Sequence, residues 1–141
     1  MYKVVFKEGP DVYKSLCVSL WCSEKHIKTY KIGKTTAAYD TLGLFSFITK
    51  YAAIKFAKPY SDRFINVVIL EVIEKYGKIS TPDNVVRTKA WMSKDEADKM
   101  LDDFYHGTLN SNDYFNQKFA IGPPVKGTVC CKNIEVIREV G

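Results

Sequence analysis

Arginine, histidine and long apolar runs are scarce in this chain of 141 residues, and each shortage excludes a class of function. Only three of the 21 lysine and arginine residues are arginines. A cluster of arginines that recognises nucleobases or phosphates through paired hydrogen bonds is therefore not expected. The two histidines, His26 and His106, lie outside any nucleophile-elbow pattern. The richest apolar stretch, residues 64–73, is far shorter than the roughly 20 residues that cross a membrane as a helix.

The composition predicts a single soluble globular domain over residues 1–141. Hydrophobic residues make up 46% of the chain and charged residues 26%, which is ordinary for a folded protein and argues against disorder. A chain of this length can bury one sizeable core. Charged Lys3, Lys7 and Glu8 near the start, without a leading apolar run, are not typical of a signal peptide. We therefore expect a cytoplasmic protein with no membrane partner.

The spacing of apolar residues predicts the α+β class: one domain, mostly antiparallel β-sheet, with two α-helices packed on it. Residues 64–77 are expected to form a central strand, because β-branched residues occupy both of its faces. The Gly9-Pro10 pair predicts a turn after the first strand, and residues 35–43 are expected to be a turn-rich connection. The other strands are expected at 2–7, 15–22, 27–34 and 44–47, with one or two more in 128–140.

Two segments carry the boundary signals of helices. The first helix is expected to begin after the N-cap residue Thr49 and to be ended by Pro59. The second has a capping box, formed by Ser93 and Glu96, and a left-handed stop at Gly107. Its acidic side chains are expected to form a solvated face. Its apolar stripe has the spacing of one helix face and consists of Ala97, Met100, Leu101 and Phe104.

The four cysteines do not form a metal-ligand pattern. Cys17 and Cys22 are separated by four residues, but alternation within a strand turns them to opposite faces, and so do the adjacent positions of Cys130 and Cys131. We expect free thiols, buried or half-buried. No pair of side chains is singled out as a candidate for acid–base or nucleophilic catalysis. The sequence therefore predicts no catalytic residue, no metal and no cofactor.

Lysine and aromatic residues alternate in the N-terminal half of the chain. Residues 1–70 contain 11 basic and 5 acidic residues, whereas residues 71–141 contain 10 and 11. Single-stranded nucleic acid is bound by cationic grooves with aromatic stacking faces, although a solvated surface explains the same pattern. The candidate residues for binding nucleic acid or another polyanion are Lys25, Lys28, Tyr30, Lys31 and Lys34.

Glu71 interrupts the apolar run VVILEVI. A carboxylate within such a strand must face solvent, a partner or a cleft, because burying it without a partner costs too much free energy. We take Glu71 as a possible cleft residue, with an exposed position on the pleated strand as the alternative.

The order of segments from Tyr30 to Val72 resembles the central part of ADP-ribosyltransferase-type folds. The matching pattern is Y-x-I-G-K-T, then GLFSFITKYAAIKFA, then INVVILEV, and it is also similar to small uncharacterised domains of phages and viruses. The resemblance implies a G-x-F element before a helix that lines a nicotinamide pocket. In that family a His or Arg motif precedes this element, but here His106-Gly107-Thr108 follows it, and the first strand offers only Lys3 and Lys7. The catalytic set of the family is therefore missing.

These observations predict a non-enzymatic binding or accessory domain, of a virus or mobile element, that contacts nucleic acid or a protein partner. The alternative is a divergent enzyme that binds NAD or another phosphate-bearing ligand. The alternative requires a cleft between the helix that begins after Thr49 and the first strands, with a titratable residue inside it. His106 is interpreted as the end of a helix, where a cation suits the negative end of the helix dipole.

Overall fold

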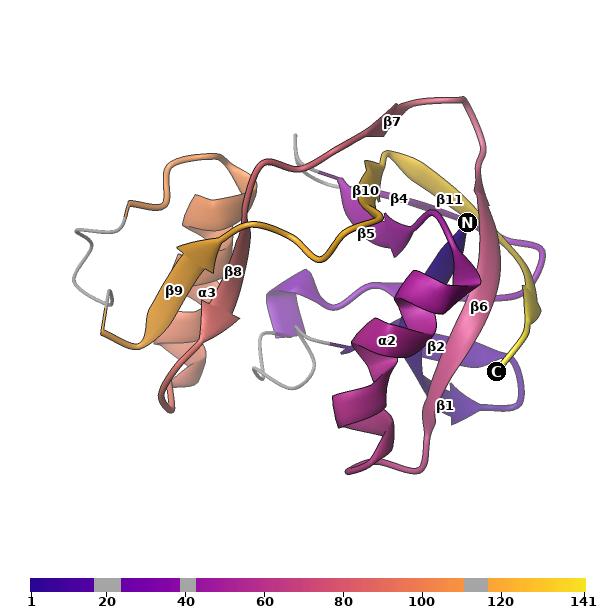
Figure 1. The fold of residues 1–141 in the computed structure, drawn as a ribbon, viewed down its shortest axis with the longest axis horizontal. Helices are drawn as coiled ribbons and strands as arrows, with labels where there is room; N and C mark the ends of the chain where they lie inside the picture. The colour runs from indigo at the N-terminus through magenta and orange to yellow at the C-terminus, as the bar shows by residue number, and fades with distance from the viewer. Residues whose placement is uncertain (17–23, 39–42, 111–116) are drawn as a thin grey trace.

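The computed structural model describes residues 1–16, 24–38, 43–110 and 117–141. They form one large antiparallel sheet with a helix on it, and a second layer made of a helix and a two-stranded sheet (Figure 1). The predicted α+β class with two α-helices is confirmed for the described residues. The large sheet contains β1 (Tyr2–Gly9), β2 (Val12–Ser15), β3 (Thr29–Tyr30), β4 (Thr35–Ala37), β5 (Leu44–Phe47), β6 (Val67–Glu74), β7 (Ile79–Ser80), β10 (Thr128–Cys131) and β11 (Asn133–Glu139).

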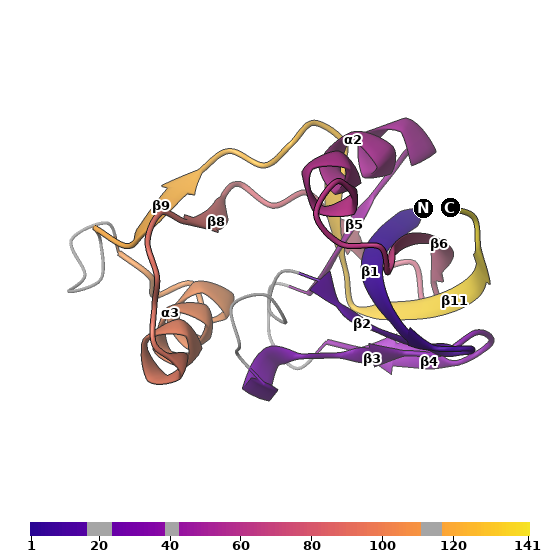
Figure 2. The ribbon, with the colours of Figure 1, turned by 90° about the horizontal axis from the view of Figure 1, so that it is seen from below.

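The other elements are two α-helices, a short 3-10 helix and two further strands. Helix α2 (Lys50–Ser61) packs on β1, β5 and β6 of the large sheet. The second layer contains α3 (Lys94–Tyr105), β8 (Val85–Thr88) and β9 (Phe119–Gly122), and η1 (Glu24–His26) contacts α3. In Figure 2 this second layer stands to one side of the large sheet and α2. No helix in the described part of the chain is long and apolar enough to cross a membrane.

The large sheet is built around β6. Its strand order is β4-β11-β6-β1-β5-β10-β7, and β2 pairs with β1 and β3. The sheet curls until its two sides meet. The segment after β3 comes from the β1 side of β6, and it contacts β11, which lies on the other side of β6. In this contact the Gly33 amide donates to the Val136 carbonyl oxygen at 2.8 Å. The prediction of a central strand within 64–77 is confirmed, with the strand itself limited to Val67–Glu74.

The core divides along the two faces of β6, because alternate side chains of a strand point in opposite directions. Leu70 and Val72 are fully buried inside the curl of the sheet, in a cluster with Ile134. Val67 and Ile69 point the other way and pack in a separate cluster with the alanines of α2. Burying each such side chain contributes about 1.5–3 kcal/mol relative to leaving it in water.

The structure corrects the strand prediction for residues 27–34. Only Thr29–Tyr30 pairs as β3, because Gly33 adopts a left-handed conformation, with φ 77°, and turns the chain. Thr35–Ala37 then pairs with β11 as β4, in a segment predicted to be a turn-rich connection. The prediction for 15–22 falls mainly on residues outside the described part of the chain. Ser15 is the last residue of β2, which follows the predicted turn after Gly9.

Helix α2 begins as predicted and ends later than predicted. The Thr49 Oγ1 accepts a hydrogen bond from the Ala52 amide at 3.1 Å, which confirms the N-cap. Pro59 lies inside the helix, which continues to Ser61, so the predicted stop at Pro59 is wrong. Proline lacks an amide donor, and its ring crowds the carbonyl group four residues earlier, but these effects are local. The next turn still closes, because the Asp62 amide donates to the Lys58 carbonyl oxygen at 3.0 Å.

Helix α3 matches its predicted start, apolar face and stop. The Glu96 amide donates to Ser93 Oγ and the Ser93 amide to Glu96 Oε1, both at 3.2 Å, which is the predicted capping box. Met100 and Leu101 are buried, as is Ala97, in the predicted stripe. Gly107 has φ 75°, the expected left-handed stop. The stripe packs against β8 and β9, two strands that were not predicted.

Candidate ligand-binding cavity

A cavity of about 630 Å³ lies between the two layers. Residues of β1, β5 and α2 line one side, and residues of β8 and α3 line the other. Its volume is within the range of about 300–1,000 Å³ that is typical of small-molecule sites. The alternative function requires a cleft between the helix that begins after Thr49 and the first strands. Lys55 of that helix and Lys3 of β1 both line the cavity, but they belong to the same wall and face the second layer across it.

Aromatic rings form much of the cavity wall. The rings of Phe45 on β5 and Phe104 on α3 have centroids 6.2 Å apart and planes only 11° from parallel. The row of rings continues from Phe104 to Tyr105, with centroids 5.4 Å apart, and from Tyr105 to His26, also at 5.4 Å. A second row on the α2 side consists of Phe47, Phe56 and Tyr60.

Basic side chains share this cavity with the rings. Lys55 and Arg87 are exposed, so they lie where the cavity meets solvent. Lys3 and Lys28 are buried, with exposed fractions of 8% and 9%. Of the described residues that line the cavity, none is an aspartate or glutamate. The charges of the described lining are therefore all positive, with His26 adding a further one when it is protonated.

The two buried lysines are held by backbone carbonyl groups. Lys3 Nζ donates to the Phe45 carbonyl oxygen at 2.5 Å and lies 5.2 Å from the centroid of the Tyr30 ring, a cation–π distance. Lys28 Nζ donates to the Ala37 carbonyl oxygen at 2.7 Å. Burial raises the pKa of the Tyr30 phenol well above its ordinary value, so the phenol is neutral at physiological pH. The ammonium groups of two lining residues are thus held in fixed positions.

The five residues predicted to bind a polyanion do not share one surface. Lys28 and Tyr30 are buried, with Tyr30 only 1% exposed, and both line the cavity. Lys31 and Lys34 are exposed at a turn, in which the Lys34 amide donates to the Lys31 carbonyl oxygen at 3.0 Å. Lys25 is exposed and pairs with an acidic residue of α3. Polyanion binding by the exposed lysines stays a prediction.

Glu71 does not line the cavity described here. Its side chain is 29% exposed, and its Oε2 accepts a hydrogen bond from Arg138 Nε at 2.7 Å across the β6–β11 pair. These contacts are those of the alternative, a partly exposed position on the pleated strand, and a role for Glu71 as a cleft residue stays a prediction. The partner strand supplies the countercharge that sequence reasoning could not identify.

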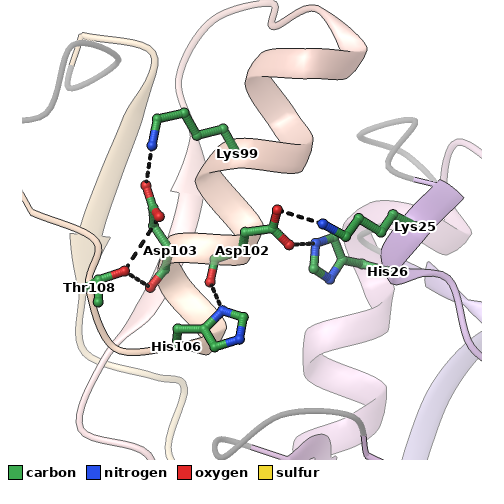
Figure 3. Close-up of polar contacts among 7 residues, drawn as sticks. All are labelled: Lys25, His26, Lys99, Asp102, Asp103, His106 and Thr108. Carbon is green, nitrogen blue, oxygen red and sulfur yellow. Dashed lines mark hydrogen bonds and ion pairs between the residues drawn. The ribbon is translucent and has the colours of Figure 1, made fainter.

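His106 ends α3, as the sequence indicated. Its Nδ1 lies 2.6 Å from the Asp102 carbonyl oxygen (Figure 3), and because a carbonyl can only accept, Nδ1 carries the proton in this contact. The Thr108 hydroxyl donates to the Asp103 carbonyl oxygen at 3.2 Å and closes the same turn. His106 caps the helix and is not part of the cavity lining.

Asp102 joins α3 to η1, and sequence reasoning missed it. Its Oδ2 accepts a hydrogen bond from Lys25 Nζ at 2.7 Å, and its Oδ1 lies 2.9 Å from His26 Nε2 (Figure 3). The second contact has the distance of an ion pair but not the geometry of a hydrogen bond, so it depends on protonation of His26. Because His26 lines the cavity, this contact holds one edge of the cavity in place.

Acid is expected to weaken the link between Asp102 and η1. The hydrogen bond from Lys25, with its positive charge and that of His26, holds the pKa of Asp102 below its ordinary value of 3.8, against the opposing effect of burial. A carboxylate whose pKa is lower in the folded state stabilises the fold when it is ionised. This contribution is complete above the unfolded-state pKa, and it is lost as the pH falls through the folded-state pKa. We expect Asp102→Asn to be less stable than the wild type at pH 7, with the difference shrinking towards pH 3.

Chemical denaturation at a series of pH values measures this difference. The matched control is Asp83→Asn, at an exposed position in the loop between β7 and β8. The control accounts for the general effect of removing one negative charge. A difference between wild type and Asp102→Asn that stays constant from pH 7 to pH 3 would show that the carboxylate charge of Asp102 does not stabilise the link.

The described cysteines are buried in the main sheet. Cys130 and Cys131 are not in a disulfide, and burial, with the nearby Glu74 carboxylate, raises the pKa of Cys131 to about 11. Cys131 is therefore a protonated core residue at neutral pH, whereas Cys17 and Cys22 lie outside the described residues. Within the described ranges, no group of three or more His, Cys, Asp or Glu side chains could hold a metal ion.

Comparisons of the chain with models of protein families, with curated proteins and with solved structures found no match. The function must therefore be inferred from the chemistry of the cavity.

Proposed function

We propose that the chain is a binding domain for a small phosphate-bearing ligand with an apolar body, held in the cavity between the two layers. One observation carries the proposal: the described lining combines four lysine or arginine side chains with seven phenylalanine or tyrosine rings around about 630 Å³. Cavities of this size are lined mainly by apolar and aromatic side chains, with a few polar groups that orient the ligand. Here those polar groups favour an anion.

The position of each cation supports a path for an anion from solvent into the cavity. Lys55 and Arg87 stand at its edge on opposite layers, and positive charge at the edge of an apolar cleft concentrates anions there. Lys3 and Lys28 lie deeper, fixed by carbonyl oxygens, in surroundings where charge interactions are stronger than in water. Arg87 offers the forked donors that suit phosphate or carboxylate oxygens.

We propose binding rather than a chemical reaction. Ser15 is a hydroxyl of the lining, and it is engaged with the backbone of Lys28. Its Oγ accepts from the Lys28 amide at 2.9 Å and lies 3.3 Å from the Lys28 carbonyl oxygen, as a donor to it. A nucleophilic serine needs instead a base that takes its proton. Ser15 thus holds the backbone of Lys28, which directly precedes β3.

Removing the charges at the edge of the cavity is expected to weaken ligand binding. We expect wild-type protein to bind at least one of AMP, ribose 5-phosphate and dodecyl phosphate, each of which carries a phosphate group, in calorimetric titrations. The double variant Lys55→Gln/Arg87→Gln should weaken that binding on the order of tenfold, since each change removes a charge-assisted hydrogen bond. The control Lys31→Gln/Lys34→Gln changes the net charge equally, at exposed residues that do not line the cavity.

Two results would count against the proposal. Failure of all three ligands to bind at millimolar concentration would reject it. A titration with single-stranded oligo(dT) tests the surface alternative: binding that is lost in Lys31→Gln/Lys34→Gln but retained in Lys55→Gln/Arg87→Gln would favour a polyanion surface instead. The slope of affinity against salt concentration would then report the number of phosphates contacted.

A further inference from the structure

We infer that the ligand carries a planar aromatic ring, which stacks on the pair formed by Phe45 and Phe104, and that it therefore belongs to the chemical class of the mononucleotides. This inference rests on the proposed function and specifies the part of the ligand that the charges do not define. Both rings line the cavity, and both are half-buried, so a ligand in the cavity meets them.

The Phe45–Phe104 pair differs from the other ring contacts of the cavity. Its planes are 11° from parallel, whereas the other pairs of described lining rings are tilted by 32°, 39°, 42° and 54°. It also joins two layers, because Phe45 belongs to β5 and Phe104 to α3. Tilted rings fill space well against any apolar group, but parallel rings from opposite walls present the faces that a flat ligand needs.

The two rings lie close enough for one ligand to meet both. Their centroids are 6.2 Å apart and their planes are nearly parallel, which is within the range of an offset-stacked pair. Because both rings are half-buried and line the cavity, a flat ring in the cavity can stack on the exposed face of the pair. An aliphatic chain has no such requirement for parallel faces.

A cation is hydrogen-bonded to the backbone of one member of this pair. Lys3 Nζ donates to the carbonyl oxygen of Phe45 itself, so an ammonium group is fixed next to the stacking residue. Arg87, at the solvent edge of the same cavity, comes from the strand next to α3 in the second layer. A ring against Phe45 and an anionic group at Lys3 or Arg87 can thus belong to one small molecule.

Truncating one ring of the pair should remove the preference for a nucleobase. Wild-type protein is expected to bind AMP on the order of tenfold to hundredfold more tightly than ribose 5-phosphate, as a stacked base does on aromatic side chains. Phe104→Leu or Phe45→Leu should weaken AMP about tenfold and leave ribose 5-phosphate unchanged. The matched control is Phe64→Leu, at a ring that packs edge-on against Phe6, 5.7 Å away, outside the cavity.

Proton NMR provides a readout that a structural role would not move. Stacking should shift the adenine H2 and H8 signals upfield in the wild type and in Phe64→Leu, and this shift should fall in either cavity variant. Equal affinity of AMP and ribose 5-phosphate, with dependence on Lys55 and Arg87 kept, would overturn the ring inference and leave the proposed function standing. Equal weakening of both ligands by Phe104→Leu would also overturn it, and absence of binding by any anion would reject both.

Discussion

Gly43→Ala is expected to destabilise the protein by about 2–5 kcal/mol, more than any surface substitution. Gly43 has φ 105°, a backbone conformation that side chains other than that of glycine rarely adopt. A Cβ there would lie 2.8 Å from the carbonyl oxygen of Cys131 and 3.3 Å from its carbonyl carbon. Because β10, which contains Cys131, is paired with β5 on one side and β7 on the other, this backbone cannot retreat alone.

Urea unfolding of Gly43→Ala and Gly33→Ala separates the cost of the backbone conformation from the cost of the steric clash. Gly33 has φ 77° and nothing within 4 Å of its added Cβ, so alanine there meets backbone strain without a clash. We expect Gly33→Ala to lose only about 1–2 kcal/mol. Equal losses in the two variants would mean that β10 yields to the new methyl group. Gly43 also lines the cavity, so Gly43→Ala that remains folded should bind the ligand more weakly.

Local features of this fold could be predicted from the sequence because their causes lie within a few residues. Ser93 and Glu96 are three positions apart, and both bonds of their capping box form in the structure. Gly107 adopts the left-handed conformation that ends the helix, and this too depends only on the residue at that position. The apolar, β-branched composition of residues 64–77 placed β6 at the centre of the sheet, since a strand apolar on both faces must be covered on both.

The candidate site depended on contacts between distant segments, which no local pattern reports. Asp102 and Lys25 are 77 positions apart, and the carboxylate looks like any other on a solvated helix face. Alternation placed Lys28 and Tyr30 on one face of a strand, but it does not say whether that face points to solvent or inward. The long Lys28 side chain can be buried because its ammonium reaches the Ala37 carbonyl oxygen. That contact exists only after the chain has folded.

The strands β8 and β9 show the same limit. Each is short, and their pairing joins Val85–Thr88 to Phe119–Gly122 across the whole of α3. Neither segment alternates over enough residues to indicate a strand by itself. The strand β8, which forms the wall opposite the main sheet together with the predicted helix α3, therefore could not be predicted from the sequence, and neither could the cavity.

Met100→Ala is expected to destabilise the second layer by about 2–5 kcal/mol while leaving the large sheet folded. Met100 is fully buried in a cluster with Val86, Leu101 and Phe119 that is separate from the two clusters around β6. A core this small has few other contacts to offset the lost side chain. The links from this layer to the large sheet include the Asp102 contacts with η1 and the Phe45–Phe104 pair, both partly exposed.

Hydrogen exchange distinguishes local from global loss of stability. In Met100→Ala, amides of α3, β8 and β9 should exchange faster while those of β6 keep their protection. The matched variant Leu70→Ala, in the fully buried cluster inside the main sheet, should speed exchange in β6 as well. Uniform acceleration across the chain in Met100→Ala would show that the two layers unfold as one unit.

The same variant connects stability to function. Met100 does not line the cavity, but Leu101, Phe104 and Arg87 do, and all three belong to the layer that Met100 supports. Met100→Ala should therefore weaken AMP binding without removing any group that touches the ligand. Saturating AMP should in turn restore protection in α3, because a ligand that binds only the folded layer stabilises it by an amount that rises with the logarithm of the ligand concentration. Protection that does not respond to AMP would place the ligand elsewhere on the molecule.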